Sequence, residues 1–580
     1  MVSKDKVREL IKAYSAEKFA AVVKLCCAPA IFADVDKTVS VEFEKGAKQK
    51  VRILGVVTNL PGAKGLSAPL LVADIDLGDK ELSERSSRSR QFKIARKTLE
   101  ALFDNPPVPI KGFLTQGIFA FHDSNGHFRV SLVTATAENG SFKYNSAKRQ
   151  SFYVTPDPNG NATFVQRMTM DWTSLAAIKE AFSVERLTKQ FYNEIQNWYF
   201  WAQLEDQHVS FPNDLNDDTD DAKFNGENLI RLITRMVFTW FLKEKGLVNP
   251  QLFDSAFLKE TLVKFDPEAK VDDPAAASVE RECTYYRAIL QNLFFATFNQ
   301  EIKRREFVDD SCNDKKRHSV KTYYRNAKLF AEKDPKKILA IFKASPFVNG
   351  GLFECLDNVV QKDKETGCEK TYCWDGFSNH LRDERRRLKS AVIPNRLFFC
   401  DETTCDLSSV LENKSAKRVK VRGLIRILES YNFTIEENSP SDEEVALDPE
   451  LLGKVFENLL GCFNPETQKM ARNSTGSFYT PREEVNYMVG ESLVAYLKRA
   501  LEGIPEAEIR ELVAGGAELD KLPTIKARVQ DVLAALFRMK LLDPACGSGA
   551  FPMGILNTMV FVLSRLDSDN VMLRQKLLQR

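Results

Sequence analysis

The sequence predicts a multi-domain α+β protein: an N-terminal α+β domain, a central helical connector, and the beginning of a Rossmann-like domain. Three observations favour this class. Strand patterns separated by turn residues fill residues 1–165, helical periodicity dominates residues 166–440, and a strand, glycine turn and helix pattern lies within residues 441–580. A chain of 580 residues with 43% hydrophobic content can bury several cores.

Short apolar runs predict the strands of the N-terminal domain. VRILGVVTNL at 51–60 and PLLVADIDL at 69–77 read as strands, and GIFAFHD and HFRVSLVTA flank the turn SNG of a predicted hairpin. A basic segment that begins at Glu84 has a hydrophobic back and predicts a helix between these strands. Residues 142–164 predict further short strands, because proline and glycine interrupt the pattern.

Longer helices are predicted for the connector. Residues 184–203 are strongly apolar, and residues 227–246 are apolar around most of the helix circumference, which predicts a buried helix that ends near Gly246. Between them, residues 211–226 are acidic and rich in turn residues, so we expect an exposed loop. Residues 325–346 show further helical periodicity.

The third part begins near Ser441. Asp448 can cap a helix that has Pro449 at its first position, and a polar loop then leads to Thr480 and Pro481, which can open the next helix. This capping role is an adequate structural explanation for the FYTP stretch. Further on, an apolar run ends at Asp543, glycines follow, and residues 550–563 read as a helix.

Such a junction suits a zwitterionic ligand. Gly547 and Gly549 let the main chain approach a ligand closely, the free N–H groups that open the helix favour an anion, and the Asp543 carboxylate favours an ammonium group or ribose hydroxyls. The spacing differs from the glycine patterns of NAD-binding and phosphate-binding loops. A bare glycine turn also occurs in α/β proteins that bind nothing there.

A family resemblance adds to this interpretation. DPACGSGAF at 543–551 closely resembles the S-adenosylmethionine motif of gamma-class adenine-N6 DNA methyltransferases, and TGSFYTP at 475–481 resembles their companion cofactor motif. The stretches ALDPELLGKVFENLLG, PFVNGGLFE and RLITRMVFTWFLKEKGL are similar to the large methyltransferase-containing proteins of type IIG restriction-modification and related phage-defence systems. The resemblance covers roughly residues 180–580.

The resemblance implies that residues 441–580 begin a Rossmann-like S-adenosylmethionine-dependent methyltransferase domain that acts on adenine in double-stranded DNA. The residues implied to bind the cofactor are Phe478, Tyr479, Thr480, Pro481, Asp543, Pro544, Ala545, Cys546, Gly547, Ser548, Gly549 and Phe551.

The same family places a catalytic [DNS]-P-P-[YF] tetrapeptide after the glycine motif, and no such tetrapeptide follows Ala550 in this sequence. We therefore expect the N-terminal portion of a methyltransferase, inactive as it stands. The alternative is a non-catalytic DNA-binding or scaffolding component of a phage-defence system. The near match Asn105-Pro106-Pro107-Val108 follows a predicted helix and is expected to be an ordinary turn.

Local charge clusters are the candidates for DNA binding, because the formal net charge is only +2. The first comprises Arg85, Arg88, Arg90, Lys93, Arg96 and Lys97; others lie at 303–325 and 382–389. Each can equally be a solvated helix face. Further restriction or phage-defence subunits are expected as partners, and the absence of a long apolar run or signal core favours a cytoplasmic protein with no membrane contact.

Two other constellations have weaker signals. Cys368 and Cys373, with Cys400 and Cys405, could supply four thiolates to zinc, but the loose spacing favours free cysteines and no metal. Asp74 and Asp76 could be nuclease acids. However, no convincing (D/E)-x-K strand follows them, so a solvated strand end is the expected role.

Overall fold

The structure is a computed structural model that describes residues 2–44, 46–62, 67–78, 82, 85–138, 141–157, 161–212, 218–272, 279–308, 320–348, 351–362, 369–378, 381, 389–411, 414–433, 442–444, 446–447, 482–515, 519–544 and 549–567. The chain forms two compact units. The first comprises residues 1–134 and 148–475, and the second comprises residues 135–147 and 476–580. The predicted N-terminal domain and helical connector thus fall almost entirely within the first unit.

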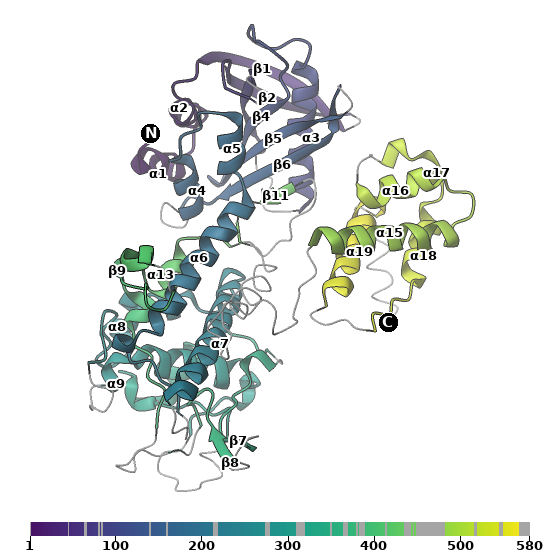
Figure 1. Cartoon of the computed structure of the whole chain (residues 1–580). Helices are drawn as coiled ribbons and strands as arrows, with labels where there is room; N and C mark the ends of the chain where they lie inside the picture. Colours follow the sequence, from purple (N-terminus) through teal and green to yellow (C-terminus); the bar gives the residue numbers. More distant parts are fainter. Residues whose placement is uncertain are drawn as a thin grey trace. The chain divides into compact units, whose positions relative to one another are not determined.

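A mixed β-sheet organises the N-terminal part (Figure 1). Its strand order is β1-β2-β3-β4-β5-β6-β11. β3 and β4 are parallel, as are β6 and β11, whereas β1–β2, β2–β3 and β4–β5 are antiparallel. The strands are β1 (Phe32–Glu44), β2 (Ala47–Val57), β3 (Leu70–Asp76), β4 (Gln116–His122), β5 (Phe128–Glu138), β6 (Ser141–Val154) and β11 (Asp442–Glu444).

Helices cover both faces of this sheet because its strands alternate apolar side chains to each side. Leu70 and Val72 of β3 join the core beneath α1 (Lys4–Lys12), α2 (Ala16–Cys26), α4 (Ala162–Met168) and α5 (Leu175–Ala181). The alternate residues Leu71, Ala73 and Ile75 are also fully buried. The helix α3 (Arg85–Leu102) lies on that other side and connects the parallel strands β3 and β4 (Figure 1).

Most strand predictions for this part are confirmed. The runs at 51–60 and 69–77 form β2 and β3, and the SNG hairpin joins β4 to β5, with Gly126 at φ +82° as its turn requires. Residues 142–164 differ from the prediction, because their first half is one long strand, β6, and their end is the helix α4. Pairing with a neighbouring strand outweighs the local turn signals.

The rest of the first unit is mainly helical. Its long helices are α6 (Val184–Ala202) and α7 (Asp218–Glu244), as predicted, and Gly246 beyond α7 has a left-handed φ of +69°. Shorter elements complete it: η2 (Glu205–Gln207), η3 (Pro250–Phe253), α8 (Ser255–Thr261), α9 (Val279–Glu282), η4 (Tyr285–Leu290), η5 (Asn292–Thr297), η6 (Ile302–Arg304), η7 (Ala327–Leu329), α11 (Pro335–Ala340), η8 (Gly351–Phe353), α12 (Arg396–Phe399), η9 (Lys414–Arg418) and α13 (Leu424–Glu429), with the hairpins β7 (Val359–Lys362)–β8 (Glu369–Tyr372) and β9 (Thr403–Cys405)–β10 (Val419–Val421).

Two predictions for the helical part are wrong. The acidic segment at 211–226 is a loop only in part, because α7 already begins at Asp218. Acidic residues favour the first turn of a helix, where the backbone dipole is positive. The segment at 325–346 forms only the short elements η7 and α11, and α11 starts at Pro335, which suits a first helical position but no helix interior.

Helices α15 (Arg482–Ala500), α16 (Glu506–Ala514), η10 (Leu519–Lys521), α17 (Pro523–Ala527), α18 (Val529–Arg538) and α19 (Ala550–Leu566) make up the described 482–567 part of the second unit. Leu493, Leu497, Leu512, Ile525 and Val562 are among its core residues. The helix predicted at 448–461 lies outside the described residues. No helix in the described parts of the chain has both the length and the apolar character needed to span a membrane.

Candidate functional site

The helices that follow the two sequence motifs pack against each other in the second unit. Val485 and Val489 of α15 and Ile555 of α19 form one buried cluster. The approach is close at Gly554, where an added Cβ would lie 2.7 Å from Cγ1 of Val485. Because Val485 is in the first turn of α15 and Gly554 is in the second turn of α19, the helix starts that follow both motifs meet.

The start of α19 has the expected backbone. Gly549 is its N-cap at φ +87°, a left-handed conformation that side chains with a Cβ rarely adopt, and Met553 N donates to the Gly549 carbonyl at 2.9 Å. Gly549 has no side chain that could cap this helix start. Free N–H groups at a helix start are the kind of donors that bind an anion.

The described motif residues flank this start. Asp543 and Phe551 are partly exposed and Pro544 is exposed. The remaining predicted cofactor residues, Phe478, Tyr479, Thr480, Pro481, Ala545, Cys546, Gly547 and Ser548, lie outside the described residues. The placement of the whole set around a cofactor therefore stays a prediction.

The prediction of a strand that ends at Asp543 is wrong. Residues 540–543 have no strand structure, and Leu541 and Leu542 are 54% and 86% exposed. A strand forms only when another strand accepts its backbone hydrogen bonds. The described residues 482–544 and 549–567 supply helices alone.

The basic helix α3 carries the six predicted DNA-binding residues, and several of their charges have protein partners. Arg96 and Lys97 each lie 2.9 Å from Glu100. Arg90 donates to Gln49 at 3.1 Å and lies over the Phe43 ring. Lys93 is partly exposed. Arg85 and Arg88 belong to the same helix, but the structure does not describe their side chains. DNA contact by this set stays a prediction.

Residues of the second basic cluster have structural roles. Arg305 donates to the carbonyls of Thr297 and Ser345 at 2.8 and 2.9 Å, and Arg325 lies over the Phe377 ring. Residues 315–317 and 382–388 lie outside the described residues.

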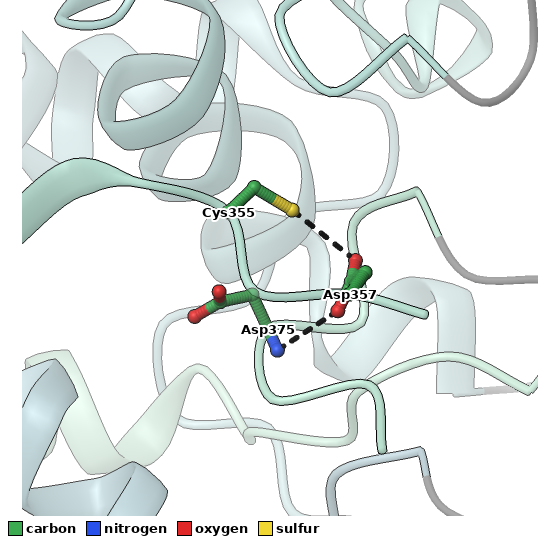
Figure 2. A group of neighbouring side chains, drawn as sticks. All are labelled: Cys355, Asp357 and Asp375. Atoms are coloured by element: carbon green, nitrogen blue, oxygen red, sulfur yellow. Dashed lines mark hydrogen bonds between the residues drawn. The ribbon is translucent and has the colours of Figure 1, made fainter. Parts of the chain in front are cut away.

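Cys355, Asp357 and Asp375 form a buried polar cluster that the sequence analysis did not identify (Figure 2). Within the described residues, it is the one group of three or more His, Cys, Asp or Glu side chains whose potential metal-ligand atoms lie within 4.8 Å of one another. Asp357 precedes β7 and Asp375 follows β8, so the β7–β8 hairpin brings them together.

Hydrogen bonds within the protein already occupy both carboxylates. The Asp357 oxygens accept the backbone N–H groups of residues 375–378 at 2.6 to 3.0 Å. Arg235 Nη1 donates to Asp375 Oδ1 at 2.5 Å, and Leu356 N donates to Asp375 Oδ2 at 2.7 Å. Lone pairs engaged in this way are not free to ligate a cation.

Electrostatics support a structural role for this cluster. Burial raises the pKa of the Cys355 thiol well above its usual range, and the nearby Asp357 and Asp375 add to the rise, so the thiolate that a metal requires is disfavoured. Burial also raises the pKa of Asp357, and its backbone donors oppose part of that rise. The cluster connects α7 to the segment that follows β8 and, through Arg235 Nε, which donates to the Leu352 carbonyl at 2.8 Å, to η8.

The parallel strands β3 and β4 bring the two candidate nuclease acids beside His122. Tyr14 Oη donates to Asp74 Oδ1 at 2.5 Å, and His122 Nε2 lies 3.4 Å from Asp74 Oδ2. Asp76 Oδ1 lies 3.9 Å from His122 Nδ1 and accepts the N–H of Gly78 at 2.8 Å. The solvated role expected from the sequence is wrong for Asp74, because its exposed fraction is only 7%. Sequence spacing cannot reveal this network, because Tyr14 comes from a distant turn.

The structure also shows where the candidate zinc cysteines and the Asn-Pro-Pro stretch lie. Cys373 and Cys400 are buried, and Cys405 is partly buried; the group above is the sole metal-ligand cluster of the described residues, and these three are not in it. Cys368 lies outside the described part. Asn105-Pro106-Pro107-Val108 follows the helix α3, as expected, rather than a strand.

Comparison with known proteins gives one similarity. No family model matches the chain, and no solved structure matches it. A protein of Methanocaldococcus jannaschii, which carries the provisional name type II restriction enzyme and methyltransferase RM.MjaORFECS2P, is 22% identical over 347 residues. The match covers 58% of this chain and 21% of that protein. The chain is thus similar, over more than half its length and about a fifth of the relative's, to a restriction-modification protein.

Proposed function

We propose that this chain carries the cofactor-binding portion of an S-adenosylmethionine-dependent DNA methyltransferase of a restriction-modification system, with adenine N6 as the methyl acceptor. The observation that carries the proposal is the packing of α15 on α19, because each helix directly follows one of the two motifs. The left-handed Gly549 at an uncapped helix start supports it, as does the similarity to the M. jannaschii protein.

The chemistry of the motif residues fits this cofactor. Asp543 can accept hydrogen bonds from ribose hydroxyls or pair with the ammonium group, and the uncapped N–H groups of α19 can bind the carboxylate. Leu541, Leu542 and the exposed side chains Met553, Leu556 and Val560 on α19 provide apolar surface of the kind that a Rossmann-like sheet covers. The cofactor, when bound, supplies the methyl group.

Adenine N6 is a poor nucleophile, because its lone pair is delocalised into the ring. Polar acceptors of the [DNS]-P-P-[YF] type would draw its protons out of conjugation once the base is flipped out of the helix. Since no such tetrapeptide follows Ala550, this 580-residue chain is proposed not to transfer methyl groups by itself.

Photo-crosslinking of labelled S-adenosylmethionine tests the cofactor site. We expect weak labelling of the chain that needs cofactor well above micromolar concentration, with the label on peptides from the second unit. Asp543→Ala should abolish the labelling, whereas Glu502→Ala, at an exposed position of the same unit, should leave it intact. Labelling that is equal in the Asp543→Ala chain would overturn the proposed site.

The second candidate is a non-catalytic DNA-binding component of a phage-defence system. The basic residues that α3 carries are the observation that favours it. In either case, we propose weak duplex binding through α3 that falls steeply with salt, because counterion release drives phosphate contacts. Charge reversal of Arg88, Lys93 and Arg96 should reduce both the affinity and the salt dependence; salt-independent binding would exclude this role of α3.

A further inference from the structure

A cavity of about 520 Å³ lies within the first unit, and none of its lining residues belongs to either cofactor motif. Its walls come from α1 and α4 on one side and from α6, β10 and α13 on the other. Small-molecule sites in proteins commonly measure about 300 to 1,000 Å³, so the cavity is large enough for a ligand of nucleotide size.

One polar part of the cavity is an ion pair with no net charge. Glu194 on α6 accepts a hydrogen bond from Arg422 Nε at 3.0 Å and another from the Tyr431 hydroxyl at 2.7 Å. Burial, reinforced by the charge of Glu194, raises the pKa of Tyr431, so its hydroxyl remains a donor. Arg422 bonds to Glu194 Oε2 alone, and Tyr431 fills one lone pair of Oε1. The second lone pair of Oε1 can accept a ligand hydroxyl.

The α1 wall carries surplus positive charge. Lys4 and Arg8 are exposed and lie one turn apart on the helix face that lines the cavity. Arg8 has a distant contact of 3.8 Å to Asp5, and Lys4 has no ion pair with any described residue. On the opposite wall, Lys420 is neutralised by Glu402 at 2.6 Å. An anionic group would therefore bind on the α1 side.

A buried guanidinium adds to this positive potential. Arg167, next to the cavity residue Gln166, is 1% exposed, and its Nε and Nη2 have no hydrogen-bond acceptor among the described residues. Burial lowers its pKa, and the nearby charge of Arg186 lowers it further. The charge of Glu180 opposes part of this lowering, but no anion is hydrogen-bonded to these two nitrogens among the described residues. A buried cation in this situation is costly, and an anion bound nearby offsets part of that cost.

The remaining wall is apolar in part, because Gln166, Gln190 and Ser430 also line it. Val165, Val421 and Ile427 are buried residues that line the cavity. A ligand that combines an anionic group, hydroxyls and a flat apolar ring would meet Lys4 and Arg8, Glu194 and these aliphatic side chains in turn. We propose that this cavity binds a nucleoside phosphate.

Isothermal titration calorimetry of the full chain with AMP tests the proposal. AMP should bind saturably, and adenosine and inorganic phosphate should each bind at least about tenfold more weakly, because each lacks one half of the complementarity. The double variant Lys4→Glu/Arg8→Glu should weaken AMP binding by about tenfold or more, as expected when charged hydrogen-bond donors are lost. The matched double variant Lys6→Glu/Lys12→Glu changes the same charge at exposed α1 positions outside the cavity and should bind as the unmodified chain does.

An Asp543→Ala chain separates this site from the proposed cofactor site and should keep full AMP affinity. Three results would overturn the proposal: no saturable AMP binding, equal affinity for AMP and inorganic phosphate, or AMP binding that depends on Asp543 and not on Lys4 and Arg8. Duplex DNA that competes with AMP as strongly as AMP itself, at equal phosphate concentration, would assign the surface to nucleic acid. That result would also overturn the proposal.

Discussion

Arg235 is the residue whose removal should cost the most stability in the connector. Its guanidinium is 3% exposed and pairs with the buried Asp375, while its Nε bonds to the carbonyl of Leu352. Arg235→Met leaves Asp375 with only the longer 3.5 Å contact to Arg231 as an ion pair among the described residues, and breaking a buried pair in this way costs about 3 to 5 kcal/mol. Arg304→Met, at a side chain that is 73% exposed, should change stability by less than about 0.5 kcal/mol. Urea denaturation measures both, and a similar small change in each would refute the structural role of the Cys355–Asp375 cluster.

His122 should make stability depend on pH. Burial alone would lower its pKa, but the hydrogen bond and charge of Asp74, together with the charges of Asp76 and Asp123, raise it overall; Tyr14 packs on its ring. Because the folded-state pKa lies above the unfolded value of about 6.5, the stabilisation is complete below that value and is lost as pH rises through the folded-state pKa. His122→Gln should therefore lose more stability near about pH 5.5 than near about pH 8.

Denaturant titrations at the two pH values check this prediction. In an Asp74→Asn background, the pH dependence of the His122→Gln effect should shrink, since the main partner is gone. An effect of His122→Gln that is the same at both pH values would show that the Asp74–His122 contact carries no charge.

At the scale of elements, alanine substitutions at two glycines test the contact between α15 and α19. An added Cβ at Gly554 would lie 2.7 Å from Val485, whereas one at Gly490 on α15 would lie 4.0 Å from Val513. Gly490→Ala should stabilise the second unit by about 0.5 to 1 kcal/mol through helix propensity. Gly554→Ala should destabilise it by about 1 to 3 kcal/mol through overpacking. Thermal unfolding measures both; equal stabilisation by the two changes would mean that the helices do not approach closely at Gly554.

Elements with strong local patterns were predictable from the sequence. β2, β3, the β4–β5 hairpin, α3, α6, α7 and α19 each have a period or turn signal of their own. The strand β1 was not predicted, because it lies at the sheet edge and charged residues fill much of it. The strand expected before Asp543 failed for the opposite reason: its apolar pattern is present, but residues 540–543 pair with no strand among the described residues.

The same distinction applies to the candidate sites. The Gly549 turn before α19 could be predicted, because glycine at a helix start is a local signal. The contacts of Asp357 with residues 375–378 and of Asp74 with Tyr14 depend on tertiary packing between distant segments. No spacing within one segment could indicate them, and the same holds for the cavity between α1 and β10.

At the scale of the whole molecule, we propose that the motifs before α15 and α19 serve methyl transfer from S-adenosylmethionine to DNA. The most direct measurement is transfer of labelled methyl groups to a mixed-sequence DNA library. It compares this chain with a longer polypeptide in which a segment that carries a [DNS]-P-P-[YF] motif follows residue 580. We expect no label from the chain alone, N6-methyladenine from the longer polypeptide, and loss of that product in its Asp543→Ala variant. Labelling by the chain alone, or undiminished labelling by the Asp543→Ala polypeptide, would contradict the proposed function.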